Sequence, residues 1–305
     1  MQFRRAGIVW CCALALMGSI LGPVSACVGA RPYGMGLAFV AVADDANATY
    51  WNPAGLLQLE RREITFMRNM NAREWVNYQD YFAYAQPLDE NSAIGISYIV
   101  KDQGIGYFGE ADKWTQNWYW LSYARRLAGN TAVGINVRTI NESLRLPGMS
   151  AETDLGVDVA LFHRIDESAT VGLLVQNANE PETTIRSASG ELIVSNIQNW
   201  RPGIALHPDP TLTVSASMYD ALNKADGLAR HIRVGVEKLV DRGERRYLVY
   251  RVGYQGIILL DAIDEAIPKG WTLGLGYGAE GFRVDAALLM HDFDDAWFLS
   301  GSYGF

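Results

Sequence analysis

Long apolar runs are missing from this chain of 305 residues once its first 26 residues are set aside. No later stretch approaches the roughly 18 consecutive apolar residues that a membrane-spanning helix needs. If the protein crosses a membrane, it must do so as a closed β-barrel, because only helices and closed barrels satisfy every backbone hydrogen bond in lipid.

Cysteine, histidine and basic residues are also scarce. Of the three cysteines, Cys11 and Cys12 lie in the first 26 residues, so Cys27 alone remains and no intrachain disulfide can form. The formal net charge of −8 argues against nucleic acid as a partner. The four histidines have no partner at metal-ligand spacing, and no catalytic nucleophile motif is present. We therefore predict no metal, no cofactor and no enzymatic activity.

One motif and two acidic clusters have simple interpretations. Gly104, Gly106 and Gly109 match the spacing of a dinucleotide-binding loop, but no strand and helix flank them as such a site requires. We interpret them as loop glycines, and the acidic residues within 261–265 and 292–295 as solvated loops.

The first 26 residues have the features of a secretory signal peptide. Arg4 and Arg5 precede an uncharged apolar stretch from residue 8 to 21, and the small residues before Cys27 fit a cleavage site. Cys27 then begins the mature chain. The sequence Val-Ser-Ala-Cys resembles a lipobox, so Cys27 is a candidate for lipidation; the alternative is ordinary cleavage that leaves an unmodified cysteine.

Alternation of apolar and polar residues dominates residues 61–305. At the C-terminus, Phe305, Tyr303, Leu299 and Trp297 alternate with glycine and serine, apart from Phe298. About fourteen such segments follow one another, joined alternately by six short turns and by mostly longer loops. We predict an all-β fold, a transmembrane antiparallel barrel of about 14 strands in the bacterial outer membrane. Its partners would be the membrane lipid and, through Phe305, the assembly machinery.

In such a barrel, the charged residues of the alternating strands point into the lumen. The predicted lumen-facing residues are Arg138, Asp154, Asp158, Arg233, Glu237, Arg251, Arg283 and Asp285. Tryptophans that follow long loops, among them Trp200, Trp271 and Trp297, are expected to form an aromatic girdle on the outer face.

Residues 27–60 do not alternate and are rich in glycine and alanine. Asp44 or Asp45 is a candidate N-cap for a short helix that runs to about Tyr50, and Pro53 would end it. Small residues suit a segment packed closely inside another structure. We therefore predict a plug, residues 27–60, inside the lumen.

The plug also carries a family resemblance. The run from Gly29 to Ala46, with Gly34-Met-Gly36 and Asp44-Asp45, resembles the N-terminal signature of the FadL/OmpP1/TodX superfamily, and of its PorV/PorQ-like branch in particular. Asn52, Pro53 and Ala54 match the Asn-Pro-Ala motif of that signature. The resemblance implies a plug that gates the lumen through Gly34, Gly36, Asp44, Asp45 and Asn52–Ala54.

Two functions are compatible with that resemblance. FadL-like members take up fatty acids or aromatic hydrocarbons, which implies passive transport of hydrophobic or small amphipathic molecules. PorV-like members serve protein secretion, which implies a sealed barrel that acts as a scaffold. The chain is much shorter than the fatty-acid transporters, so the resemblance does not extend to fatty-acid specificity.

Overall fold

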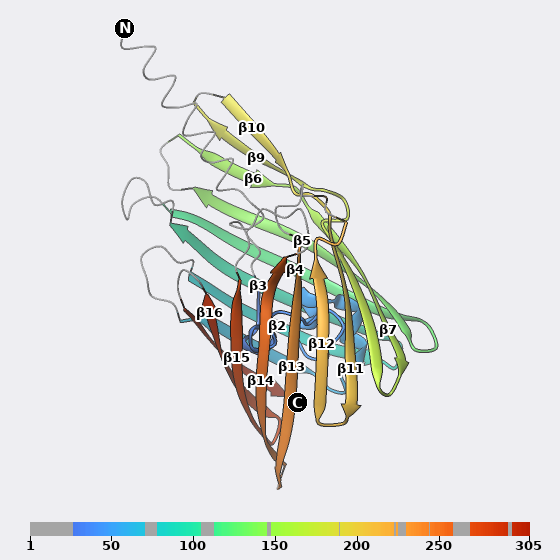
Figure 1. Ribbon diagram of the computed structural model, residues 1–305. Coiled ribbons are helices and arrows are strands. Elements are labelled where there is room, and N and C mark those ends of the chain that lie inside the picture. Colours follow the sequence, from blue (N-terminus) through green and yellow to red (C-terminus); the bar gives the residue numbers. More distant parts are fainter. Residues whose placement is uncertain are drawn as a thin grey trace.

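A computed structural model describes residues 27–70, 78–104, 113–144, 148–188, 190–222, 224, 230–243, 245–258, 269–291 and 295–305. Fourteen antiparallel strands form one closed barrel (Figure 1). The fourteen predicted strand positions all fall within these strands. Their bounds are β1 Glu63–Asn69, β2 Tyr78–Asp89, β3 Ser92–Gly104, β4 Lys113–Ala128, β5 Thr131–Leu144, β7 Gly156–Asp166, β8 Ala169–Gln176, β11 Asn199–Asp209, β12 Leu212–Tyr219, β13 His231–Gly243, β14 Arg246–Ile258, β15 Gly270–Ala279, β16 Phe282–His291 and β17 Ala296–Gly304.

The last strand closes the barrel against the first, as predicted. Strand β17 pairs with β1 in the register Glu63 to Gly304 and Asn69 to Phe298. All six predicted short turns connect neighbouring strands. The first residue of β1 and the last residue of β17 pair with each other on the same side of the barrel as these turns. We call this end of the barrel the short-turn side and the opposite end the loop side.

Period-2 alternation determines which side chains enter the lumen. In β5, Ile135 is 40% exposed on the outer face while the neighbouring Asn136 is fully buried. Trp271 and Trp297 are exposed on the outer face, and Trp200 is partly exposed there. The remaining tryptophans of the predicted girdle, Trp75 and Trp114, have side chains outside the described part of the chain.

A separate three-stranded sheet was not expected. Strands β6 (Ser150–Thr153), β9 (Glu182–Ser187) and β10 (Gly190–Ser195) pair in the order β10-β9-β6 within segments that the sequence suggested were long loops. Figure 1 shows this sheet beyond the loop side of the barrel. Exposed ion pairs link its strands: Arg186 contacts both Glu152 and Glu191 at 3.1 Å.

The N-terminal segment lies inside the barrel (Figure 1). It contains two short helices, α2 (Ala30–Gly34) and α3 (Ala48–Trp51), and the 3₁₀ helix η1 (Pro53–Gln58). The capping prediction was wrong: Asn47 precedes α3, and the Asp45 carboxylate instead accepts the Asn47 backbone N–H at 3.0 Å. Among the described residues, no helix has both the length and the apolar character to cross a membrane.

Candidate functional site

Glycines on the inner face of the barrel provide the seat for the plug. A Cβ atom on Gly134, Gly172, Gly235 or Gly253 would lie less than 3.0 Å from plug backbone. These glycines belong to four strands, β5, β8, β13 and β14, on different parts of the wall. Backbone therefore meets backbone, and no side chain separates the plug from the wall at these points. This contact fits the plug tightly into the lumen.

Asn52 joins the plug to itself and to the wall. Its side-chain N–H groups donate to the Val40 carbonyl at 2.9 Å and to the Leu161 carbonyl of β7 at 3.1 Å. Its side-chain oxygen accepts the Ala54 backbone N–H at 3.1 Å. Pro53 then begins η1, where its missing N–H costs nothing. The predicted motif Asn52-Pro53-Ala54 is thus an anchoring turn against the wall.

Gly34 and Gly36 form the opposite anchor. The Thr272 hydroxyl of β15 accepts the Gly36 backbone N–H at 3.0 Å and donates to the Gly34 carbonyl at 3.2 Å. Gly36 has a φ of 59°, a left-handed conformation that glycine adopts without strain, and its backbone lies directly over Gly253. Two anchors on different parts of the wall therefore hold the plug.

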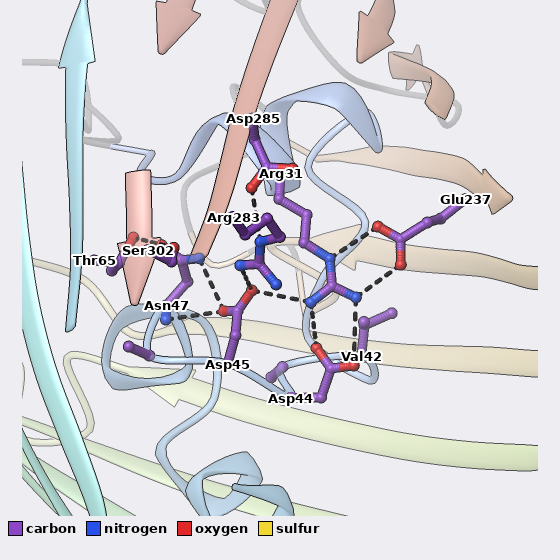
Figure 2. A network of polar contacts seen from close by, with 12 residues as sticks. Arg31, Val42, Asp44, Asp45, Asn47, Thr65, Glu237, Arg283, Asp285 and Ser302 are labelled. Atoms are coloured by element: carbon purple, nitrogen blue, oxygen red, sulfur yellow. Dashed lines mark hydrogen bonds and ion pairs between the residues drawn. The ribbon is translucent and has the colours of Figure 1, made fainter. Parts of the chain in front are cut away.

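Charged residues connect the plug to the short-turn half of the wall (Figure 2). Arg31 of the plug contacts Asp44 at 2.5 Å, Asp45 at 2.9 Å and Glu237 of β13 at 2.7 Å. Arg283 of β16 reaches the same Asp45 at 2.8 Å. The plug and the wall thus share one ionic network.

Wall residues extend this network. Arg251 of β14 contacts Glu237 at 2.5 Å and Asp285 of β16 at 2.7 Å, and Arg283 contacts Asp285 at 2.8 Å. Three arginines thus face four carboxylates, and every cation has at least two anionic partners. Burial of Asp45 raises its pKa, but the guanidinium groups of Arg283 and Arg31 outweigh the burial and bring the pKa below the ordinary 3.8. The carboxylate is therefore held in its charged form.

The loop-side half of the lumen is lined with cations and aromatic rings. Arg138 of β5 lies 5.3 Å from the ring of Trp118 and 5.9 Å from the ring of Trp120, and 3.7 Å from the Asp158 carboxylate. Arg233 lies 4.7 Å from the ring of Tyr219. Both arginines therefore pack against aromatic rings on the loop side of the plug.

Most predicted lumen-facing residues have their side chains inside the barrel: Arg138, Asp158, Arg233, Glu237, Arg251, Arg283 and Asp285. The prediction that Asp154 faces the lumen was wrong. It is exposed and precedes the first residue of β7, because the strand begins only at Gly156. The period-2 pattern extends two residues beyond the strand and so placed Asp154 wrongly.

Three buried cationic residues inside the barrel were not predicted from the sequence: Arg31, Lys101 and Arg201. Arg31 stands in a segment without periodicity, so no pattern assigned it a side. Lys101 and Arg201 continue the inner faces of β3 and β11, where Ile99 and Gly203 also point inward. The alternation of these two strands was a signal that could have found them.

Cys27 is buried, and its carbonyl accepts an N–H of the Gln79 side chain at 2.8 Å. Lipidation stays a prediction, and an acyl chain could reach lipid only if Cys27 left this position. Among the described residues, no group of three or more histidine, cysteine, aspartate or glutamate side chains is arranged to hold a metal ion. The two acidic clusters and the loop glycines 106 and 109 lie largely outside the described residues.

Comparisons with known proteins agree with this geometry. The sequence matches no protein-family model and no curated protein sequence. Solved structures do match, and the three named next each cover 91% of this chain. They include the CymD monoaromatic hydrocarbon channel (13% identity, TM-score 0.62, 97% of that chain), a Pseudomonas aeruginosa FadL homologue (10%, 0.65, 98%) and the Ralstonia pickettii toluene transporter TbuX (12%, 0.61, 98%). The chain therefore has the FadL-type barrel fold, to which its plug sequence also pointed.

Proposed function

We propose that the protein is an outer-membrane channel for passive transport of hydrophobic or small amphipathic molecules, and that the plug controls their passage. The observation that carries this proposal is the seating of the plug on inward-facing glycines. A barrel whose lumen is filled by its own N-terminal segment is sealed at rest, so transport requires that segment to yield. The shared fold with channels named for hydrocarbon and toluene transport supports the substrate class.

The contacts of the plug are of a kind that can be exchanged. Asn52 is held by three hydrogen bonds and Arg31 by three ion pairs. Each can break and re-form without rearrangement of the barrel strands. We infer that the turn Asn52–Ala54 moves when the plug yields, because it is held to the wall by packing on Gly134 and by a side-chain hydrogen bond from Asn52 to the Leu161 carbonyl at 3.1 Å.

Uptake of a hydrophobic fluorescent dye by cells that carry the protein tests this function. Whole cells are required, since a phospholipid bilayer alone does not exclude such a dye. We expect dye uptake to rise when the protein is present. Deletion of residues 29–55, and separately Asn52→Ala, should change the uptake rate, whereas Gly301→Ala should not, because an added Cβ there meets nothing within 4 Å.

Equal uptake with and without the protein would contradict the proposal. If the protein then co-purified with a stoichiometric protein partner, the scaffold function of PorV-like proteins would be favoured instead.

A further inference from the structure

The outer surface of the barrel carries a groove across the neighbouring strands β11 to β15, which lie side by side in Figure 1. Its volume is about 460 Å³, within the range of roughly 300–1,000 Å³ that small-molecule sites occupy. Its lining side chains are aliphatic or aromatic except for Ser215, whose hydroxyl turns inward and donates to the Ala38 carbonyl of the plug at 2.7 Å. The groove therefore suits an apolar ligand.

The sizes of its residues explain why this part of the wall is hollowed. Valines and one alanine, Ala216, line the middle of the groove, whereas Leu206 of β11 and Trp271 of β15 stand at its ends. Its floor includes Gly235 and Gly253, where the wall lies directly on the plug backbone. The groove is therefore the outer side of the same wall that seats the plug.

The groove is long, narrow and oblique. It crosses five strands, and four spacings of roughly 4.8 Å make it roughly 19 Å long. Strand β13 contributes two outward side chains, Val234 and Val236, so the width is roughly 7 Å. Trp271 directly follows the loop-side start of β15, whereas Leu206 lies three residues before the short-turn end of β11. One extended acyl chain fits this shape better than a compact ring system does.

A pair of opposite charges stands beside the short-turn end of the groove. Lys238 lies two residues beyond Val236 on the same outward face of β13. Its Nζ donates to the Thr211 hydroxyl at 2.5 Å and lies 3.4 Å from both carboxylate oxygens of Asp209. The side chains of Lys238 and Asp209 are each 45% exposed, so a ligand in the groove can reach both.

These two charges hold each other loosely. A charge-assisted N–H···O bond is about 2.7–2.9 Å long, so the 3.4 Å between Lys238 and Asp209 is a weak contact. Asp209 Oδ1 accepts the backbone N–H of Thr211 at 2.8 Å and also its hydroxyl. In the described part of the chain, Oδ2 contacts only Lys238. A head group with one negative and one positive charge would complement both side chains.

We propose that the groove binds one zwitterionic phospholipid, a phosphatidylethanolamine, from the leaflet on the short-turn side. One acyl chain lies in the groove, the phosphate contacts Lys238 and the ammonium group contacts Asp209. Phosphatidylglycerol, whose head carries only the negative charge, would meet Lys238 equally well but would leave Asp209 without a cation. The proposal requires that the barrel lie in a membrane and does not depend on transport.

Native mass spectrometry of the purified full-length protein in a neutral detergent tests the proposal. The protein is first equilibrated with mixed micelles that contain equal amounts of phosphatidylethanolamine and phosphatidylglycerol with the same acyl chains. We expect one retained lipid per barrel. Phosphatidylethanolamine should be retained about 3–5-fold more often than phosphatidylglycerol, the ratio expected for one exposed ionic contact.

Two alanine variants test the groove itself. Ala216 lies opposite Val234 of β13, and in Ala216→Phe the new ring occupies the space of the acyl chain from the lipid side, without entering the lumen. We expect lipid retention to fall about 10-fold or more. Ala286→Phe is the matched control, because Ala286 lies opposite the exposed Leu275 on the outer face and outside the groove. Its lipid retention should equal that of the wild type.

Two aspartate variants test the head-group contact. Asp209→Asn keeps an acceptor for the Thr211 N–H but removes the negative charge, so the preference for phosphatidylethanolamine should disappear while one lipid is still retained. Asp89→Asn is the matched control. Asp89 accepts the Asn91 backbone N–H at 2.7 Å in the turn between β2 and β3, strands that do not line the groove. It should leave the preference unchanged.

The proposal is overturned if no lipid is retained, if Ala216→Phe retains as much lipid as Ala286→Phe, or if the wild type retains both phospholipids equally. A dimer that Ala216→Phe disrupts would also overturn it, since the groove would then be an interface between two copies of the chain. A protein that retains the lipid but does not raise dye uptake would contradict the proposed transport and support this site.

Discussion

Arg31 of the plug and Glu237 of β13 form a two-point ion pair, with Nε to Oε2 at 2.8 Å and Nη2 to Oε1 at 2.7 Å. The two residues are 206 positions apart in the chain. The pair is buried and has further partners on both sides, Asp44 and Asp45 for Arg31 and Arg251 for Glu237. It connects the segment that fills the lumen to the wall that surrounds it.

Removal of one member of this pair should destabilise the protein strongly. Arg31→Gln leaves Glu237 and Asp45 with fewer cationic partners in a buried site. We therefore expect the free energy of unfolding to fall by about 3–5 kcal/mol. Denaturant unfolding in detergent, followed by circular dichroism, measures it. Arg68→Gln removes an exposed pair on the outer face and should cost less than about 1 kcal/mol. Similar losses in both variants would argue against a special role for Arg31.

A methyl group on Gly235 should disturb the plug. The new Cβ of Gly235→Ala would lie under 3.0 Å from the Met35 carbonyl oxygen, and overpacking of this kind costs about 1–3 kcal/mol. We expect a lower melting temperature and a higher ion conductance in planar bilayers, because a displaced plug opens the lumen. Gly301→Ala serves as the control. A tight barrel with unchanged conductance in Gly235→Ala would mean that the plug does not depend on this contact.

Asn52→Ala should loosen the anchoring turn. The substitution leaves the carbonyls of Val40 and Leu161 without the side-chain donor and removes the acceptor of the Ala54 N–H, at a cost of about 1–3 kcal/mol. Hydrogen exchange of the amides in residues 38–56 measures the effect directly, and faster exchange is expected there with no change in the barrel strands. Asn91→Ala, in an exposed turn, is the comparison. Exchange that is unchanged in Asn52→Ala would rule out the anchoring role.

Acid should weaken the plug through Asp45. Because the folded-state pKa of Asp45 lies below its ordinary value of 3.8, its stabilising contribution is complete above that value and is lost as the pH falls through the folded pKa. The stability difference between the wild type and Asp45→Asn should therefore shrink as the pH falls below about 4. Melting temperatures of both proteins across this range provide the measurement. A difference that grew on acidification would have the wrong sign.

Deletion of Phe305 should affect assembly rather than stability. Its ring is half exposed on the outer face and contacts Tyr303, and its backbone N–H donates to the Arg62 carbonyl at 2.9 Å. If Phe305 is an assembly signal, cells should contain less of the shortened protein in the outer membrane, while refolding in detergent should proceed as in the wild type. Equal losses in both experiments would instead indicate a folding role. Quantitative membrane fractionation and a refolding assay provide the two measurements.

The sequence by itself determined the barrel. Period-2 alternation in segments such as Val133–Arg138 or Leu155–Leu161 states which side chains face inward, because a strand directs successive side chains to opposite faces whatever lies around it. The count of fourteen strands, the short turns and the closing strand that ends near Phe305 followed from the same local rule. Asp154 was misplaced because alternation does not report where hydrogen bonding to the neighbouring strand begins.

Only the tertiary structure decided how the lumen is filled. The plug has no periodicity, so its sequence could not state that Met35 lies on Gly235 or that Arg31 reaches Glu237. These contacts join residues some 200 positions apart, and their partners are set by barrel closure and by the stagger between strands, not by any local pattern. For the same reason, the alternation pattern could not distinguish Gly134, Gly172, Gly235 and Gly253 from other strand glycines, because only the closed barrel places the plug backbone on them.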